Sequence, residues 1–241
     1  MYDKELSLAQ HLAVEAGKEI MTFFKKEYTI TEKHDYDHDS QSTSADLAAN
    51  ELIVNGLKKE FPYHILAEET VDNPSRLNHT IIWIVDPLDG TKQFIAGDSG
   101  FTVNIALVEH GRPVVGVIYS PVTDELFSAA RGSGAFHTAH KITKQIHVSS
   151  KTNFKDMIIV ESKNHSNLHI MAALEPLFAS SQKVGSSLKG CLVAEGSADI
   201  YFRFGPTSEW DICAMHCIVE EAGGRITSMD GTEITYNREN V

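Results

Sequence analysis

The feature that most constrains this chain is the segment Ile81–Thr91, with the sequence Ile-Ile-Trp-Ile-Val-Asp-Pro-Leu-Asp-Gly-Thr. Its first five residues, Ile81–Val85, form an apolar run without helical spacing, which predicts a short buried strand. We expect the strand to end at Asp86-Pro87, because proline removes a backbone donor and restricts the residue before it. The carboxylates of Asp86 and Asp89 then lie together on the turn that leaves the strand.

The turn after this strand carries groups that suit both a cation and an anion. Neighbouring carboxylates repel each other unless a cation joins them, and Mg²⁺ prefers oxygen ligands. Gly90 permits close backbone approach, and Thr91 adds a hydroxyl beside free backbone N–H groups, which suit an anion. These residues predict a magnesium and phosphate site. They also fit a solvated surface turn of the Asp-Pro and Asp-Gly kind, and the residues alone leave both interpretations open.

The composition limits the class of protein. A chain of 241 residues can bury a full core, as one large domain or as two lobes. It contains no apolar run long enough for a transmembrane segment, and its first residues lack the pattern of a signal peptide. Its three cysteines give no even disulfide framework, which favours a reducing compartment. We therefore expect a cytoplasmic protein; loose association with the cytoplasmic face of the inner membrane stays open.

The net charge of −12 restricts the partners. It argues against a nucleic-acid polymer or an anionic membrane surface as the main partner. A small anionic substrate is compatible with this charge, because each divalent ion bound among acidic residues adds two positive charges. The oligomeric state, monomer or homodimer, stays open.

The order of the expected elements indicates an α/β protein. Apolar residues at spacings of three and four predict an amphipathic helix that ends near residues 25–26. A second helix opens at residues 43–46, and we expect Leu47 among its buried side chains. Residues 32–40 are polar and aperiodic, which predicts a loop.

The remaining elements divide the chain near residue 150. The expected strands are residues 63–67, 101–109, 113–120, 126–129, 134–138, 142–148, 158–160 and 199–204, and the expected helices are residues 168–178, 185–194 and 211–221. Strands that alternate with helices after a long meander predict two lobes, residues 1–150 and 151–241, with a cleft between them.

Acidic residues occur repeatedly at the ends of these elements. Glu68 follows the strand at residues 63–67, as Asp86 and Asp89 follow the next one, and Asp211 opens the last helix after Trp210. Asp211 alone also fits an ordinary helix N-cap. Asp46, in the first turn of its helix, likewise fits a carboxylate that only complements the helix dipole.

Two motifs together resemble those of a known family. Residues 86–91, Asp-Pro-Leu-Asp-Gly-Thr, are similar to the first motif of the lithium-sensitive, magnesium-dependent phosphatases of the inositol monophosphatase superfamily. Trp210-Asp211 with Gly223-Gly224 is similar to their second motif. The likeness runs from the helix of Asp46 to Ile226. It implies a sandwich of alternating helix and sheet layers, with a metal site in the cleft between two lobes.

Within that superfamily the chain is most similar to the CysQ branch, the 3′(2′),5′-bisphosphate nucleotidases. The stretches that carry this likeness are residues 83–91, 101–107, 185–189, 191–196 and 201–207. The implied function is hydrolysis of 3′(2′)-phosphoadenosine 5′-phosphate, a by-product of sulfate assimilation, to AMP and phosphate. Two alternatives stay open: an inositol-1-phosphate or sugar-phosphate phosphatase, and a non-catalytic phosphonucleotide sensor.

The resemblance implies a set of metal ligands. They would be the carboxylates of Glu68, Asp86, Asp89 and Asp211 and the backbone carbonyl of Leu88. Two to three Mg²⁺ ions would bind there and activate the attacking water. Inhibition by Li⁺ is implied, and Ca²⁺ should inhibit because its longer bonds fit a tight magnesium cluster poorly.

The resemblance also implies the roles of the surrounding residues. Asp46, Thr91 and Glu68 would be catalytic: Asp46 and Thr91 would orient and deprotonate the water. The N–H groups of Gly90 and Thr91 would hold the phosphate, and no phosphoenzyme is required. Substrate binding would also involve four residues of the C-terminal half besides Asp211: His165, Ser186, Lys189 and Arg203.

Two features of the C-terminal half have competing interpretations. Residues 162–165 are Ser-Lys-Asn-His where CysQ-like chains usually have Ser-Arg-Ser-His, which keeps a cation and the imidazole. Lys189 and Arg203 also fit solvated surface charges. Cys213, His216 and Cys217 share a helical face, which could suggest zinc, but a fourth ligand is not apparent and we favour core packing.

Overall fold

The computed structural model of the chain describes residues 2–34, 39–163 and 167–240. The helices are α1 (Asp3–Phe23), α2 (Ser44–Glu60), α3 (Thr91–Ile95), α4 (Leu168–Leu174), α5 (Leu188–Ala194) and α6 (Glu209–Glu221), with 3₁₀ turns η1 (Pro74–Asn78), η2 (Phe154–Asp156) and η3 (Glu175–Leu177). The strands are β1 (Ile30–His34), β2 (Asp39–Thr43), β3 (His64–Ala67), β4 (Ile81–Asp89), β5 (Thr102–Glu109), β6 (Arg112–Ser120), β7 (Glu125–Ala130), β8 (Gly134–Ala139), β9 (Ile142–Ile146), β10 (Ile158–Ser162), β11 (Ser180–Val184) and β12 (Ile200–Tyr201).

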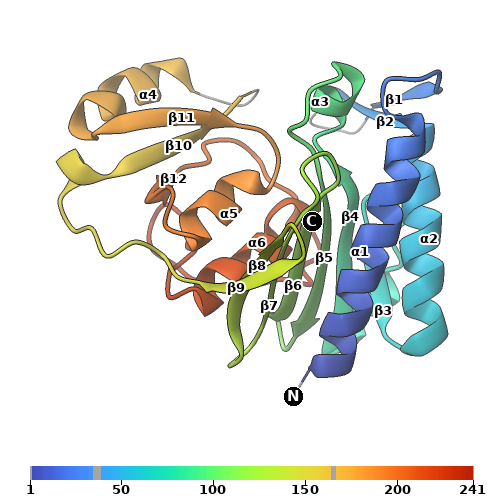
Figure 1. Ribbon diagram of the computed structural model, residues 1–241. Coiled ribbons are helices and arrows are strands. Elements are labelled where there is room, and N and C mark those ends of the chain that lie inside the picture. The colour runs from blue at the N-terminus through green and yellow to red at the C-terminus, as the bar shows by residue number, and fades with distance from the viewer. Residues whose placement is uncertain (1, 35–38, 164–166, 241) are drawn as a thin grey trace.

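The elements form alternating layers (Figure 1). A seven-stranded sheet has the order β3-β4-β5-β6-β7-β8-β9, in which only β3 and β4 pair in parallel. Helices α1 and α2 cover one face of this sheet, and α6 packs on the other face. Helix α5 lies between α6 and a three-stranded parallel sheet of order β11-β10-β12. This alternation confirms the expected layered α/β fold.

Burial on both faces explains the apolar run that begins β4. Successive side chains of a strand point to opposite faces. Trp83 and Val85 therefore join the core beneath α1 and α2, whereas Ile82 and Ile84 join the core beneath α6. A strand covered on both sides needs apolar residues at every position, which is why this segment shows no alternation.

Strand β4 runs further than expected. Its pairing with β5 continues to Asp89 opposite Thr102, with a shift of register between Asp86 and Asp89. This bulge accommodates Pro87, which lacks the N–H group that a regular ladder would use. The expected end of the strand at residues 86–87 is therefore wrong, and both carboxylates lie on the bulged end of a strand.

Three other local expectations need correction. Residues 32–40 were expected to form a loop, but the described part of this region forms the antiparallel hairpin of β1 and β2. Leu47 is 51% exposed, because it lies on the solvent side of α2. The expected strand at residues 199–204 comprises only Ile200 and Tyr201, which pair with β10.

The hairpin of β5 and β6, the meander to β9 and the final helix are confirmed. None of the helices in the described ranges combines the length and apolarity needed to cross a membrane. The seven-stranded sheet ends before residue 150 and the three-stranded sheet begins after it, but α6 packs on the first sheet. The division into lobes 1–150 and 151–241 stays a prediction.

Candidate functional site: an acidic and basic cavity

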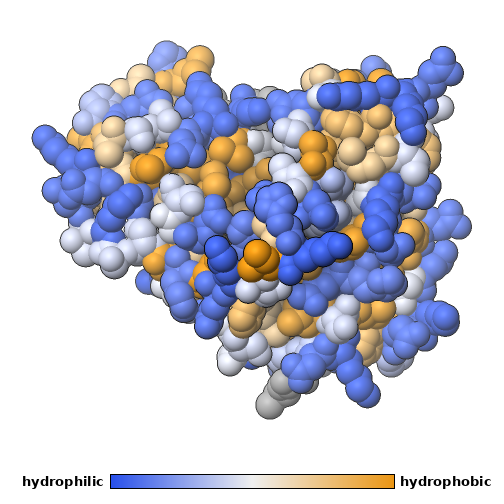
Figure 2. Space-filling view, in the orientation of Figure 1, coloured by the Kyte–Doolittle hydropathy of each residue, from blue (hydrophilic) through white to orange (hydrophobic). Residues whose placement is uncertain are grey.

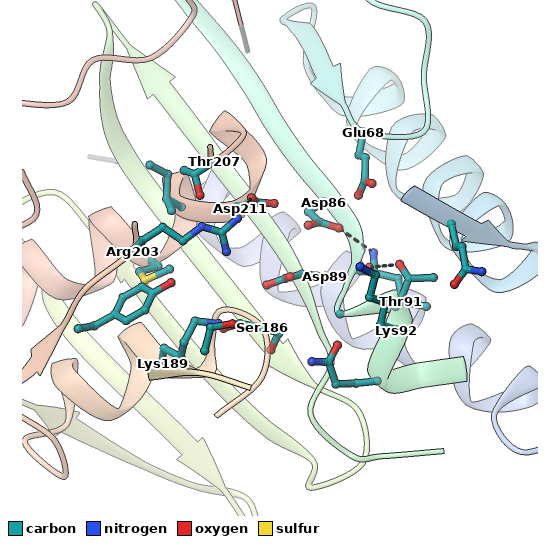
Figure 3. Close-up of a pocket in the computed structure, with 18 residues that line it drawn as sticks. Glu68, Asp86, Asp89, Thr91, Lys92, Ser186, Lys189, Arg203, Thr207 and Asp211 are labelled. Atoms are coloured by element: carbon teal, nitrogen blue, oxygen red, sulfur yellow. Dashed lines mark hydrogen bonds and ion pairs between the residues drawn. The ribbon is translucent and has the colours of Figure 1, made fainter. Parts of the chain in front are cut away.

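A cavity of about 300 Å³ opens where the carboxyl end of β4 faces α5 and α6 (Figure 3). Ten of the residues named from the sequence line it: Glu68, Asp86, Leu88, Asp89, Gly90, Thr91, Ser186, Lys189, Arg203 and Asp211. Asp46 lies behind Thr91, and His165 falls outside the described residues. Glu68 and Asp86 lie toward one side, Lys189 and Arg203 lie toward the other, and Asp89 and Asp211 lie between them, with Asp211 beside Arg203 (Figure 3).

The acidic side is a cluster of carboxylates. Oxygens of Asp86, Asp89 and Asp211 lie within 4.8 Å of one another. Burial raises the pKa of Asp86 well above its usual range, and the charges of Glu68, Asp89 and Asp211 raise it further. Burial and then Asp89 raise the pKa of Asp211 to about 6, although Arg203 opposes this shift. The cluster therefore concentrates negative charge that the protein alone does not balance.

This donor set fits a hard divalent cation. The ligands on offer are carboxylate oxygens, which Mg²⁺ prefers, and the excess of negative charge is what a divalent ion would neutralise. The local backbone also orients two of these carboxylates. Leu88 N–H donates to Asp86 Oδ1 at 3.1 Å within the bulge, and Asp211 sits in the first turn of α6, where its carboxylate accepts from the N–H of Ser208.

A buried polar network that the sequence did not predict holds the carboxylate of Asp89 and the backbone of Asp211. It is formed by Ser187, the N-cap of α5, and by Asn104 of β5. Ser187 Oγ lies 2.8 Å from Asp89 Oδ2 and 3.0 Å from the backbone oxygen of Asp211. Asn104 Nδ2 donates to Ser187 Oγ at 2.8 Å and lies 3.3 Å from Asp89 Oδ2. Thr102 Oγ1 in turn donates to Asn104 Oδ1 at 2.9 Å. Such outer contacts orient metal-binding carboxylates.

Thr91 and Asp46 form a second polar pair at the edge of the cluster. Thr91 Oγ1 lies 3.1 Å from Asp46 Oδ1 and 3.3 Å from the backbone oxygen of Leu88. Asp46 is buried, and burial raises its pKa, although hydrogen bonds from Thr43 oppose the shift. Asp46 also completes a capping box with Thr43, so it serves the start of α2 as well as contacting Thr91.

The basic side is built by the first turn of α5, the loop before it and the segment after β12. Lys189 is only 5% exposed, its ammonium donates to the backbone oxygen of Ser186, and it lies 5.4 Å from the ring centre of Tyr201. Its interpretation as a solvated charge is therefore wrong. Burial lowers the pKa of Lys189, and the charge of Asp89 opposes this shift.

Three buried polar atoms on the same side of the cavity as Lys189 have no hydrogen-bond partner: Ser186 Oγ, Arg203 Nε and Thr207 Oγ1. All three residues line the cavity. Buried polar atoms without partners are rare in folded proteins, so they mark places where a ligand can bind. Thr207 was not among the site residues predicted from the sequence. Its position in a segment resembling nucleotidases, residues 201–207, was the only available signal.

The cysteines and the histidine of α6 belong to the core. Cys213, His216 and Cys217 are all buried, and His216 Nδ1 lies 2.8 Å from the hydroxyl of Tyr236. The favoured interpretation as packing residues is confirmed.

Comparison with known proteins agrees with this fold and site. The chain matches the sequence model of the inositol monophosphatase family over residues 1–241, and it therefore belongs to that family. Members of the family depend on metal ions, and the carboxylate cluster is a site that could bind them.

Among the relatives is the 3′(2′),5′-bisphosphate nucleotidase CysQ of Escherichia coli strain K12. It is 39% identical over 232 residues, which cover 93% of this chain and 91% of the relative. The crystal structure of CysQ from Bacteroides thetaiotaomicron is 33% identical, with a TM-score of 0.84 and coverage of 100% of this chain and 94% of that chain. The suhB protein of Bartonella henselae is 30% identical, with a TM-score of 0.84 and coverage of 95% and 89%.

Proposed function

We propose that this chain is a magnesium-dependent 3′(2′),5′-bisphosphate nucleotidase that hydrolyses 3′(2′)-phosphoadenosine 5′-phosphate to AMP and phosphate. The observation that carries the proposal is the division of one cavity into two sides. A carboxylate cluster lines the same cavity as a buried lysine and three unpartnered polar atoms. A substrate with two phosphates can use both sides, whereas a monophosphate can use only one. The activity of the CysQ relatives supports the same assignment.

The acidic side would hold two to three Mg²⁺ ions through Glu68, Asp86, Asp89, Asp211 and the backbone carbonyl of Leu88. All five residues line the cavity. The negative charges of Glu68, Asp89 and Asp211 raise the pKa of Asp86, which supports this role. When bound, such ions supply Lewis acidity at the phosphoryl oxygens and make water more acidic. Their number and their displacement by Li⁺ or Ca²⁺ are part of the proposal.

Thr91 and Asp46 would move the proton of the attacking water. The Thr91 hydroxyl can donate to Asp46 while it accepts a hydrogen bond from water, because a hydroxyl has one donor and two acceptor positions. Burial raises the pKa of Asp46, which makes it a stronger base than an exposed aspartate. Glu68 would orient the same water from the side of Asp86. The N–H groups of Gly90 and Thr91, at the start of α3, would hold the reacting phosphate.

The basic side would bind the second phosphate. Lys189, Ser186 and Arg203 are the donors expected from the sequence, and we add Thr207 because its hydroxyl is buried without a partner. Charge-assisted hydrogen bonds to phosphate are among the strong ones in proteins. A contribution from His165 stays a prediction.

A phosphate-release panel tests the proposal. The substrates are 3′-phosphoadenosine 5′-phosphate, inositol 1-phosphate and fructose 1,6-bisphosphate, each with Mg²⁺ and with chelator. We expect release from the bisphosphonucleotide to be fastest and to disappear with chelator. Faster release from inositol phosphate would instead assign an inositol phosphatase. Nucleotide binding without release from any substrate would assign a sensor.

A further inference from the structure

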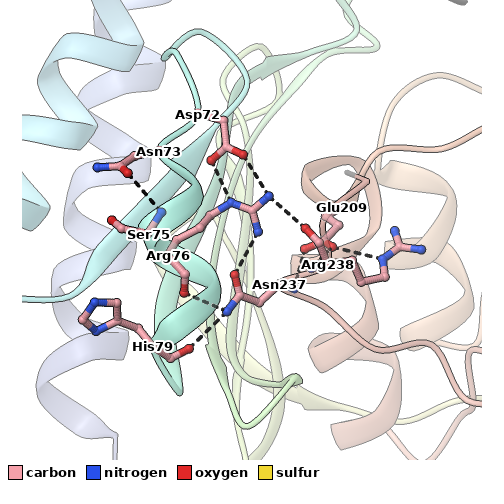
Figure 4. Close-up of polar contacts among 8 residues, drawn as sticks. All are labelled: Asp72, Asn73, Ser75, Arg76, His79, Glu209, Asn237 and Arg238. Carbon is pink, nitrogen blue, oxygen red and sulfur yellow. Dashed lines mark hydrogen bonds and ion pairs between the residues drawn. The ribbon is translucent and has the colours of Figure 1, made fainter.

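The C-terminal segment of the described chain passes the first turn of α6 and is hydrogen-bonded to it (Figure 4). Glu209, the first residue of α6, is completely buried. Its carboxylate accepts from the backbone N–H groups of Asn237 and Arg238, at 2.7 and 2.8 Å, and from Arg238 Nε at 3.0 Å. A buried carboxylate with three donors is well satisfied and has little freedom to move.

The other side of the same segment is hydrogen-bonded to η1. Arg76 is 1% exposed and donates to both carboxylate oxygens of Asp72, at 2.7 and 3.0 Å. It also donates to Asn237 Oδ1 and to the backbone oxygen of Arg238, both at 2.9 Å. Asn237 Nδ2 lies 3.1 Å from the backbone oxygens of Arg76 and of His79. We call the five residues Asp72, Arg76, Glu209, Asn237 and Arg238 the clasp.

The clasp joins the two chain segments that approach the acidic side from different directions. Asp72 lies four residues after Glu68, and Glu209 lies two residues before Asp211. The N–H groups in the first turn of a helix have no intrahelical acceptors, so this end of a helix tends to fray. Asp211 depends on that turn, because the protein contacts of its carboxylate are the N–H of Ser208 at 3.3 Å and Arg203 at 3.9 Å.

We propose that the clasp positions Asp211 for the metal ion, with Asn237 and Arg238 as positioning residues that do not touch ion or substrate. The inference rests on the proposed metal site. Loss of the clasp should loosen the first turn of α6 and weaken ion binding more than it weakens the fold. Substitutions behind metal ligands commonly weaken metal affinity by about 10- to 100-fold.

The variant Asn237→Gly tests this directly. Asn237 has a φ of 64°, which glycine adopts without strain, so the variant deletes the side-chain bonds and keeps the backbone path. Arg238→Ala is a second variant, in which only the bond from Nε to Glu209 is lost. The matched control is Tyr236→Phe, which removes a buried bond from the same segment to the middle of the same helix, at His216.

The measurement is Mg²⁺ binding followed by tryptophan fluorescence, since Trp210 adjoins Asp211, with the Mg²⁺-dependent rise in Tm as a second readout. We expect Asn237→Gly to need about tenfold more Mg²⁺ than the wild type for the half-maximal change. Arg238→Ala should show a smaller increase, and Tyr236→Phe should match the wild type. If Asn237→Gly does not fold, Arg238→Ala decides, because the Arg238 side chain is 44% exposed and Glu209 keeps both of its backbone donors in this variant.

Two results would overturn the inference. One is an equal shift in Asn237→Gly and Tyr236→Phe; the other is an unchanged Mg²⁺ requirement in both clasp variants. Both leave the proposed function intact if the wild type responds to Mg²⁺ and releases phosphate from the bisphosphonucleotide. A wild type without any Mg²⁺ response would overturn the metal site, and the clasp proposal with it.

Discussion

Lys189 is a buried cation on the basic side of the cavity, and Lys189→Met removes its charge while keeping a long, flexible side chain. Burial lowers the pKa of this ammonium, which means that the folded protein bears a cost for keeping it charged. Methionine has no such cost and fits irregular apolar space. We therefore expect the variant to be as stable as the wild type, or more stable, in the absence of substrate.

The loss in turnover can be worked out from the contacts of the ammonium. It has three donors, of which one is used by the backbone oxygen of Ser186. A phosphate on the basic side would take at least one of the others. A hydrogen bond involving a charged group contributes about 1.5–3 kcal/mol, which corresponds to a loss of about 10- to 150-fold in kcat/KM.

The assay compares two substrates that differ only in the second phosphate, 3′-phosphoadenosine 5′-phosphate and adenosine 3′-monophosphate, at saturating Mg²⁺. We expect Lys189→Met to reduce kcat/KM for the bisphosphate by about 10- to 150-fold and to leave kcat/KM for the monophosphate nearly unchanged. Lys183→Met is the control, because Lys183 lies on β11 with its side chain 56% exposed and does not line the cavity. Equal losses on both substrates would refute the assignment of Lys189 to the second phosphate, as would no loss on either.

Three further predictions concern the acidic side and α6. Asp89→Asn should reduce Mg²⁺-dependent phosphate release by more than about 100-fold, since it removes a proposed ligand, and excess Mg²⁺ should not restore it. Ser187→Ala should raise the Mg²⁺ requirement by about tenfold and keep most of kcat at saturating Mg²⁺, because the hydroxyl only orients Asp89 and Asp211. Burial lowers the pKa of His216, against the opposing charge of Glu220, so the unfolded chain takes up this proton first as the pH falls. The contribution of His216 to the free energy of unfolding is therefore complete above the unfolded pKa and is lost below it, at up to about 1.4 kcal/mol per pH unit. Denaturant titrations should show that the free energy of unfolding falls more between pH 7 and pH 5 in the wild type than in His216→Gln.

The part of the acidic side on β4 was predictable because its determinants are local, whereas the inclusion of Glu68 and Asp211 was implied only by the family resemblance. Asp86, Asp89 and Thr91 lie within six residues, after a run whose apolar character alone predicts a buried strand. The capping residue at position 43 likewise predicted the start of the helix that carries Asp46. The expected N-cap of the last helix, Asp211, is wrong, because Ser208 caps α6 and Asp211 lies in its first turn. What the local pattern could not predict was the bulge: Pro87 suggested the end of a strand, whereas pairing with β5 carries β4 through it.

The supporting contacts were not predictable, because they join residues far apart in the chain. Asn104 and Ser187 are 83 positions apart, and Arg76 and Asn237 are 161 positions apart. Neither pair has a spacing or motif that marks it as a contact. The segment after β12 was also not predictable from its local pattern. That pattern predicts a strand, but Arg203 and Thr207 line the cavity instead of extending the sheet.

The opposite charges of the two sides also determine the order in which ion and substrate should bind. In a chain of net charge −12, a phosphate that approaches Asp86, Asp89 and Asp211 without an ion meets like charge. Asp89 and Asp211 meanwhile favour the charged form of Lys189, in opposition to burial. Ions at the proposed site would neutralise these carboxylates and remove their support for the charged lysine, and the second phosphate of the substrate would supply that support again. We therefore expect ion binding to come before substrate binding, because it would remove repulsion on the acidic side and leave the buried lysine in need of an anion.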